Sequence, residues 1–227
     1  MATTTQPRSR TTTAAAPKRR AADIAYDKIE TLISKLSIEP GSPVVEAELA
    51  ELTGLGRTPV REALMRMVSI GLVVQQPRRG LLVSTIDVVD HLDVIQTRRV
   101  LEQLIAASAA RRATAVQRKA LLTCAHKMVE AAARGNLDAY MAADQALDHV
   151  VHDACRNASA VKAVVPLVVQ CRRFWYAYQH EGEIGEAARA HLAMAESIAS
   201  GNEAEAAQGA SRLMDYLELF TRRVIDA

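Results

Sequence analysis

The chain has 227 residues, with 28 lysines and arginines against 26 aspartates and glutamates, and a formal net charge of +2. Hydrophobic residues make up 49% of it and charged residues 24%, which is typical of a globular protein with room for two modest domains. No run of about 18 apolar residues and no signal-peptide pattern is present, which argues against a membrane protein and predicts a cytoplasmic location. The three cysteines lack the spacing of a zinc finger or a disulfide framework.

The charge is unevenly distributed along the chain. Residues 1–85 carry 12 basic and 8 acidic side chains, whereas acidic side chains are in excess in the remainder. Residues 1–21 are rich in threonine, alanine and arginine without any periodicity, which predicts a disordered basic arm. The basic half is therefore the candidate for binding a polyanion.

Two helices are predicted after this arm. Apolar residues recur at helical spacing over residues 24–36, so one face of that helix can be buried. A Pro-Gly turn at residues 39–43 follows, and residues 47–53 form a second, shorter helix that ends at Gly54.

A third helix is predicted over residues 58–70. Thr58 is placed to cap its N-terminus, and Pro59 fits its first turn. Arg57 and Arg61 lie on the opening turn, where a helix that enters the major groove presents its base- and phosphate-binding side chains. A surface helix with two solvated arginines is the alternative for this segment alone. The DNA-binding residues predicted here are Arg57, Thr58, Pro59, Arg61 and Arg66.

The three helices are in helix-turn-helix order, and a hairpin follows them. Their predicted shared core is Leu49, Leu52, Val60, Leu64 and Met67. Gly71 ends the third helix, and residues 72–76 and 81–84 form two short strands around Pro77-Arg78-Arg79-Gly80. Arg78, Arg79 and Gly80 at the tip can approach a phosphate backbone or a minor groove, with an ordinary basic turn as the alternative. The pattern predicts a winged helix-turn-helix over residues 22–85.

These motifs resemble the DNA-binding domain of the GntR family of bacterial transcription regulators. The matching residues are Pro40-Gly41, Glu48-Leu49-Ala50, Arg57-Thr58-Pro59-Val60-Arg61-Glu62-Ala63-Leu64, Gly71-Leu72-Val73 and Arg79-Gly80 ahead of Val83. The resemblance implies that Arg57, Thr58 and Arg61 contact operator bases and phosphates and that Gly80 and its neighbouring arginines form the wing. Gly56 stands where the family usually has serine, which removes one phosphate hydrogen bond.

Residues 86–227 are predicted to be entirely helical. Alanine-rich amphipathic segments follow one another, separated by Gly- and Asn-containing breaks. The predicted helices span residues 87–111, 115–133, 136–156, 159–180, 184–200 and 203–226. The fold class is thus mainly α, with an antiparallel bundle of six to seven helices after the winged domain. Such bundles bind ligands between helices.

Several polar residues in this half have helical spacing. Arg98 and Glu102 are four residues apart, and a solvated surface ion pair is the favoured interpretation. Asp144, Asp148 and His152 recur every four residues beside an apolar stripe, and His191 could join them from another helix. One face of the bundle interior is therefore predicted to gather oxygen and nitrogen ligands.

This half resembles the FCD ligand-binding domain of the FadR subfamily. The resemblance rests on residues 98–102, 144–157 and 191–201. In many members an aspartate and three histidines hold a divalent metal to which a carboxylate effector binds. Asp144 and His191 match two positions, Asp148 stands in place of a histidine, and no histidine lies at residues 213–215. The resemblance implies a metal site at Asp144, Asp148 and His191, with manganese, magnesium, zinc or nickel as candidates and Asp215 as an additional oxygen donor.

Two alternatives to a metal remain open. In one, the pocket is metal-free and an organic acid pairs with Arg98, Arg172 or Arg173, with His152 as a further effector-binding residue. In the other, the polar residues only satisfy one another. The aromatic cluster at residues 174–178 is either packing and dimer contact or a cap over the pocket.

The expected function is a homodimeric repressor that binds a palindromic operator through two recognition helices. The helical domain is also expected to carry the dimer contact. A small carboxylate metabolite bound in this domain is expected to control the affinity of the protein for duplex DNA. The competing interpretations are a metal-dependent hydrolase and an architectural DNA binder without effector. The hydrolase lacks a nucleophile and base constellation and a phosphate-binding loop, so we expect no enzyme.

Overall fold

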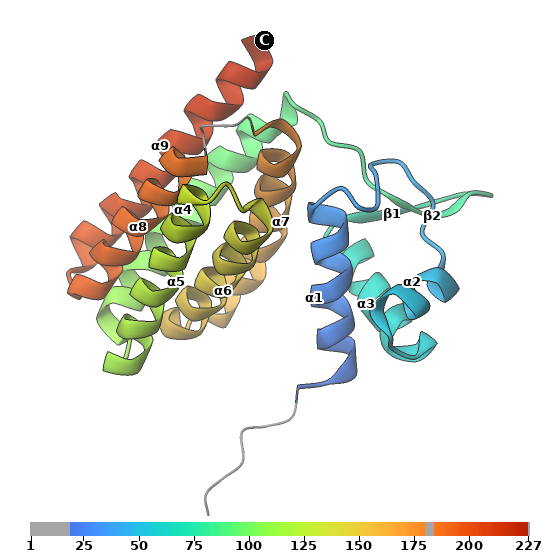
Figure 1. Ribbon diagram of the computed structural model, residues 1–227, viewed down its shortest axis with the longest axis horizontal. Helices are drawn as coiled ribbons and strands as arrows, with labels where there is room; N and C mark the ends of the chain where they lie inside the picture. Colours follow the sequence, from blue (N-terminus) through green and yellow to red (C-terminus); the bar gives the residue numbers. More distant parts are fainter. Residues whose placement is uncertain (1–18, 180–183, 227) are drawn as a thin grey trace, which may run out of the picture.

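The computed structural model describes residues 19–179 and 184–226, and in these it forms two domains joined by one connection (Figure 1). The predicted basic arm falls mostly on residues 1–18, outside the described residues. The N-terminal domain consists of α1 (Ala21–Ser34), α2 (Glu46–Thr53), α3 (Arg57–Ser69), β1 (Val73–Gln76) and β2 (Gly80–Val83). The C-terminal domain consists of α4 (Asp90–Arg112), α5 (Ala115–Ala133), α6 (Leu137–Cys155), α7 (Ala158–Tyr178), α8 (Ile184–Ser200) and α9 (Glu203–Asp226). None of the described helices is long and apolar enough to cross a membrane.

The first three helices pack around one small core, as a helix-turn-helix requires. Gly54 ends α2 with a backbone φ of +69°, a left-handed conformation that glycine adopts without a Cβ clash. Ile29, Val60 and Leu64 are fully buried together. The prediction that Leu52 belongs to this core is wrong, because its side chain is 66% exposed. The buried stripe of the short α2 runs through residues 49 and 53, and residue 52 falls beside it.

The hairpin forms the predicted wing and is extended by a third segment. β1 and β2 are antiparallel, with Val73 opposite Val83 and Gln76 opposite Gly80. The segment before α2 lies along β2, since Val44 donates its backbone N–H to the carbonyl of Leu81 at 2.8 Å. This contact fixes the base of the wing to the helix-turn-helix.

The C-terminal bundle is organised around α4, which contacts α6, α7, α8 and α9. Helix starts are fixed by side-chain caps: Thr114 and Gln117 form a capping box on α5, and Asn136 and Asn157 cap α6 and α7. The six predicted helices are confirmed, each described bound lying within three residues of the prediction. The mainly helical fold with a winged N-terminal domain is therefore the one expected from the sequence.

The two domains contact each other along α1 and α7, which lie side by side (Figure 1). Val169 of α7 is buried in the hydrophobic core of the N-terminal domain. Lys35, next to the end of α1, forms an ion pair with Asp138 of α6 at 2.7 Å. The first helix of the DNA-binding domain therefore rests directly on the helices that carry the polar residues singled out from the sequence.

Candidate functional site

The third helix begins one residue earlier than predicted. α3 starts at Arg57, its N-cap is Gly56, and no side chain caps it, so the assignment of Thr58 as N-cap is wrong. Because Gly56 has an extended backbone and Pro59 falls in the first turn, the start of the helix is set by backbone geometry. Thr58 remains exposed on the opening turn.

The exposed face of α3 is basic, and its arginines differ in how they are held. Arg57, Thr58, Arg61 and Arg66 line one shallow surface depression. Arg61 donates from Nε and Nη2 to the carboxylate of Glu46 on α2, at 2.8–3.1 Å. No hydrogen bond or ion pair holds Arg57 among the described residues. Glu46 thus orients Arg61 on the surface, and Arg57 is directly available to a phosphate or a base edge.

Arg66 is turned toward α1 rather than out along α3. Its Nη1 donates to Asp23 at 2.8 Å, and its guanidinium lies 4.5 Å from the centre of the Tyr26 ring. Burial and the nearby charge of Glu30 raise the pKa of Tyr26 to about 12. Of the residues predicted on α3, Arg66 therefore has a structural role in fixing α1 to α3.

The tip of the wing carries Arg78, Arg79 and Gly80, all exposed. Gly80 has a φ of +78°, and Arg78 adopts a φ of +66°, which is uncommon for a residue with a side chain. This turn presents two arginines away from the body of the domain. The predicted residues of the wing thus lie together at one exposed edge.

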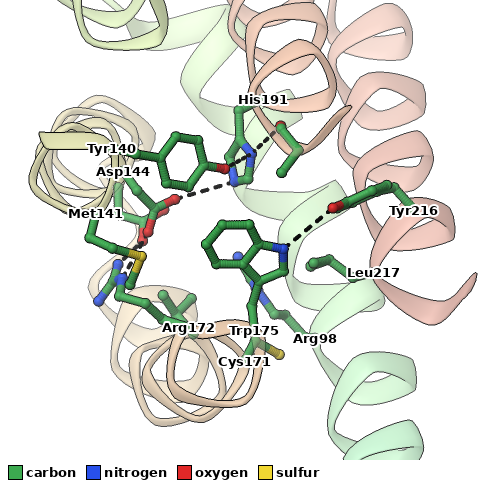
Figure 2. A pocket seen from close by; sticks show the side chains of 13 residues that line it. Arg98, Tyr140, Met141, Asp144, Cys171, Arg172, Trp175, His191, Tyr216 and Leu217 are labelled. Carbon is green, nitrogen blue, oxygen red and sulfur yellow. Dashed lines mark hydrogen bonds and ion pairs between the residues drawn. The ribbon is translucent and has the colours of Figure 1, made fainter. Parts of the chain in front are cut away.

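A buried cavity lies among α4, α6, α7, α8 and α9 (Figure 2). Its volume is about 30 Å³, which is the space of a water molecule rather than of a metabolite. Trp175 stands in its centre and donates its indole N–H to the hydroxyl of Tyr216 at 3.3 Å. The predicted residues that line it are Arg98, Asp144, Asp148, Arg172 and His191.

Arg172 connects three carboxylates at this cavity. Its Nε donates to Asp144 at 2.8 Å, and its Nη2 donates to Asp148 at 2.5 Å. Its Nη1 donates to Glu30 of α1 at 2.7 Å. Arg172, Glu30 and their partners are all largely buried, with side-chain exposures of 6–15%. One guanidinium therefore joins the DNA-binding domain to the interior of the bundle.

The cluster shifts the ionisation of its members in different directions. Burial disfavours the charged form of Asp144, but Arg172 and His191 outweigh it and lower the pKa of Asp144. Burial and the adjacent charge of Asp144 raise the pKa of Asp148. Burial opposes a charged His191, yet its contacts with Asp144 at 3.3 Å and with the carbonyl of Ala187 at 2.8 Å raise its pKa. Asp144 thus holds its negative charge more strongly than Asp148.

Arg98 and Glu102 form a buried ion pair, and the expectation of a surface pair is wrong. Nε of Arg98 lies 2.9 Å from Oε1 of Glu102, and the two residues are 6% and 4% exposed. Arg98 and Glu102 lie on the buried face of α4, together with Ile95 and Ile105, so the pair is inside the bundle. The carboxylate of Glu102 and the nearby Cys171 raise the pKa of Arg98 despite its burial.

The described geometry does not fit a metal at Asp144, Asp148 and His191. The guanidinium of Arg172 occupies the position between the two aspartates, where a divalent cation would have to coordinate both, and two cations there would repel each other. Asp215, considered as an additional ligand, instead pairs with Arg99 on α4. Within residues 19–179 and 184–226 no group of three or more potential ligands converges. The arrangement is that of an arginine-centred ion cluster.

Two further residues predicted to bind an effector do not line the buried cavity, although the cleft at His152 also contains Asp148 and Arg172. His152 faces α1, in a cleft that also contains Tyr26, Glu30 and Val169. Arg173, next to Arg172 in sequence, points to the connection between the domains and donates to Ser84. Adjacent positions on a helix are about 100° apart, so the two arginines serve different sites.

Sequence reasoning missed Glu30, Tyr140 and Tyr216. Glu30 could have been found, because it falls on the apolar face of α1 beside Ile29 and Ile33, where a carboxylate needs a buried partner. Tyr140 and Tyr216 carried no comparable pattern. In the aromatic cluster, Phe174 and Trp175 are packed in the interior at 1% and 5% exposure, and Trp175 also lines the cavity.

Comparison with known proteins assigns both domains. Residues 93–216 match the FCD domain, and residues 21–83 match the bacterial regulatory proteins of the gntR family. The chain belongs to the GntR family. Its members are transcription regulators that bind operator DNA, not enzymes, so the expectation of no catalytic activity is confirmed at the level of the family.

Curated relatives are described as regulators. An uncharacterized HTH-type transcriptional regulator in the TAR-I ttuE-ttuC' intergenic region of Agrobacterium vitis is 32% identical over 124 residues, 53% of this chain and 72% of that protein. An uncharacterized HTH-type transcriptional regulator in an unstable DNA locus of Streptomyces ambofaciens is 40% identical over 62 residues, 27% of this chain and 26% of that protein.

Solved structures agree with the described fold. McbR/YncC of E. coli superposes with a TM-score of 0.77 at 16% identity, covering 92% of this chain and all of that chain (100%). A putative transcriptional regulator GntR from Rhodococcus sp. RHA1 has a TM-score of 0.65 at 18% identity, covering 91% and 98%. At such identities the likeness concerns the fold.

Proposed function

We propose that this GntR-family protein is a homodimeric repressor of the FadR type that binds a palindromic operator. Each recognition helix, α3, reads one half-site, and two-fold symmetry of the dimer matches the two half-sites. The exposed basic residues of α3 and the wing support this proposal, because phosphate contacts supply much of the affinity for duplex DNA. A repressor of this kind works in the cytoplasm.

We also propose that a small organic acid controls operator affinity by acting on the Arg172 cluster, without a metal. The supporting observation is the hydrogen bond between Arg172 and Glu30, which joins the cavity to α1. Four carboxylates, Glu30, Glu102, Asp144 and Asp148, surround two guanidiniums in and around the cavity. Because acids are already in excess, an incoming carboxylate gains a cation only by displacing one of them.

Glu30 is the carboxylate whose displacement has consequences for DNA. It is the member of the cluster that belongs to the DNA-binding domain, whereas Asp144 and Asp148 lie on α6 of the bundle. When the ligand carboxylate takes its place on Arg172, α1 loses its main polar contact with α7, and the domains are released from their present arrangement. The ligand thereby binds one arrangement better than the other, which is the requirement for control by a ligand.

The small volume of the cavity supports two distinct states. At about 30 Å³ it cannot admit a metabolite in the described arrangement, so binding requires the helices around Trp175 to move. A coupling of ~1 to 3 kcal/mol between ligand and operator, corresponding to roughly 5- to 150-fold in affinity, is sufficient for regulation.

Selection of genomic fragments by the purified protein tests the DNA-binding part of this proposal. Bound fragments are then footprinted, and we expect a protected site with two symmetric halves. A panel of organic acids is added to the complex in a gel-shift assay, and at least one acid should lower the affinity. A control panel of amines of similar size should not. Failure to enrich any fragment at physiological salt would contradict operator binding, and a response to amines instead of acids would contradict the ligand class.

A further inference from the structure

Another pocket lies between the domains, apart from the buried cavity and from the cleft at His152. It is formed by the connection that follows β2, the start of α4 and one face of α7, and its lining includes Ser84, Asp87, His91 and Arg173. Its volume is about 290 Å³, close to the lower end of the range for small-molecule sites, roughly 300 to 1,000 Å³. The cavity around Trp175 holds only about a tenth of that space. This interdomain pocket can therefore admit a metabolite without rearrangement.

Arg173 in this pocket is a buried cation that pairs with no carboxylate among residues 19–179 and 184–226. Its residue exposure is 3%. It donates to the hydroxyl and the carbonyl of Ser84, which use two of the five N–H protons of a guanidinium, and its buried Nε has no partner. Burial alone lowers the pKa of Arg173 to about 10. In the described part of the chain no carboxylate compensates this charge.

The other buried arginines of the helical domain show that this situation is specific to Arg173. Arg172, one position earlier, contacts three carboxylates, and Arg98 is paired with Glu102. A buried charge is normally paired, because removal from water is costly unless an opposite charge replaces the lost hydration. Arg173 is thus a buried positive charge whose surroundings favour the binding of an anion.

The residues that line the pocket limit the kind of anion that it can bind. Asp87 lies at its exposed side and accepts hydrogen bonds from the backbone N–H groups of Val89 and Asp90, so its carboxylate is already engaged in the turn before α4. Asp90 is a second exposed carboxylate in the lining. Two acids near the opening disfavour a multiply charged ligand. His91, stacked on Phe174 with ring centres 3.8 Å apart, and Val94 offer nonpolar contact to the rest of a ligand.

We propose that the interdomain pocket is a binding site for a small monocarboxylate whose carboxylate pairs with Arg173. This site is additional to the Arg172 cluster of the proposed function. A ligand here contacts the connection, α4 and α7 together, so it would fix the position of the DNA-binding domain relative to the bundle.

Thermal unfolding of the full chain without DNA tests the site. Acetate, pyruvate and benzoate are titrated against chloride at constant ionic strength, with inorganic phosphate as a separate arm. We expect at least one monocarboxylate to raise the Tm of the wild-type protein in a saturable way, because it binds the folded state. Arg173→Met should show no such response, whereas Arg99→Gln, which removes an arginine outside both sites, should respond like the wild type.

The same variant gives a second readout that does not depend on a ligand. In chloride, Arg173→Met should be at least as stable toward urea as the wild type, because it removes an uncompensated buried charge. The proposal is overturned if the wild type responds to none of the carboxylates, if Arg173→Met responds as the wild type does, or if phosphate stabilises more than the carboxylates. Since no DNA is present, these results are independent of operator binding.

Discussion

In the N-terminal domain the candidate functional arginines are exposed, whereas in the helical domain they are buried. Arg57 on α3 and Arg78 on the wing are available to solvent, and Arg61 is only oriented by Glu46. Arg98 and Arg172 are instead enclosed by carboxylates of their own chain. The difference shows that one domain exposes its charges to a polyanion outside the protein, whereas the other holds its charges in a closed internal cluster.

Breaking the internal cluster should have the largest effect on stability. Arg172→Gln leaves Glu30, Asp144 and Asp148 buried without their common cation, and loss of one partner of a buried pair costs ~3 to 5 kcal/mol. We expect urea denaturation to show a decrease of this size. Adding Glu30→Gln and Asp144→Asn should restore part of the stability. If Arg172→Gln alone is as stable as the wild type, the cluster does not stabilise the fold.

The next effect concerns pH, and it originates at His91. Burial, with a smaller contribution from Arg98, lowers the pKa of His91 from 6.5 to about 4 in the folded protein. Between these values the unfolded chain binds more protons, so the free energy of unfolding decreases as pH falls from 6.5 toward 4, by on the order of 3 kcal/mol.

His91→Phe provides the control for this prediction. It keeps an aromatic ring beside Phe174 but cannot be protonated. The part of the acid destabilisation that His91 causes should disappear from urea unfolding curves recorded across that pH range. An unchanged pH dependence would show that the pKa of His91 is the same in the folded and the unfolded protein.

A smaller effect, on DNA binding alone, is expected at the exposed face. Arg57→Ala should weaken operator binding by ~1 to 3 kcal/mol and leave the unfolding free energy nearly unchanged. Arg134→Ala, just after the end of α5, removes another exposed arginine in the helical domain and is the control. Fluorescence anisotropy of an operator fragment measures the operator affinity of both variants. Equal affinities of the two variants would mean that α3 does not face the DNA.

The smallest effect is expected at the tip of the wing. Arg78 has a left-handed backbone, which glycine adopts without the cost of about 1 to 2 kcal/mol that a side chain carries. Arg78→Gly should therefore be slightly more stable in urea, although it loses a charge near the DNA and should bind the operator more weakly. A simultaneous loss of stability and affinity would show that the wing depends on this side chain for its fold.

Much of the fold could be predicted because it depends on local patterns. Apolar spacing and Gly or Asn breaks located the six helices of the bundle, and Gly71 and the Pro77 turn located the wing. Errors in the DNA-binding domain concern single positions. Thr58 lost its capping role because the helix starts at Arg57, and Leu52 is exposed because the short α2 buries only a narrow stripe.

Several residues of the polar site could be predicted from the sequence, but their interactions could not. The spacing of Asp144 and Asp148 correctly placed both on one face, where they line the cavity together with His191. Figure 2 shows the contact between Asp144 and His191. The pattern could not reveal that Arg172 lies between the aspartates, since that position depends on how α6 and α7 pack. Nor could it reveal Glu30, whose partner is 142 residues away in sequence.

Operator affinity in the presence and absence of a releasing acid tests the central claim, that Glu30 and Arg172 connect the ligand to DNA binding. Glu30→Gln removes this link, whereas Asp138→Asn removes a different ion pair between the domains, with Lys35, away from the cavity. Fluorescence anisotropy should show that the acid weakens operator binding by the same factor in the wild type and Asp138→Asn, and by a factor close to one in Glu30→Gln. A Glu30→Gln protein that responds to the acid like the wild type would contradict the account.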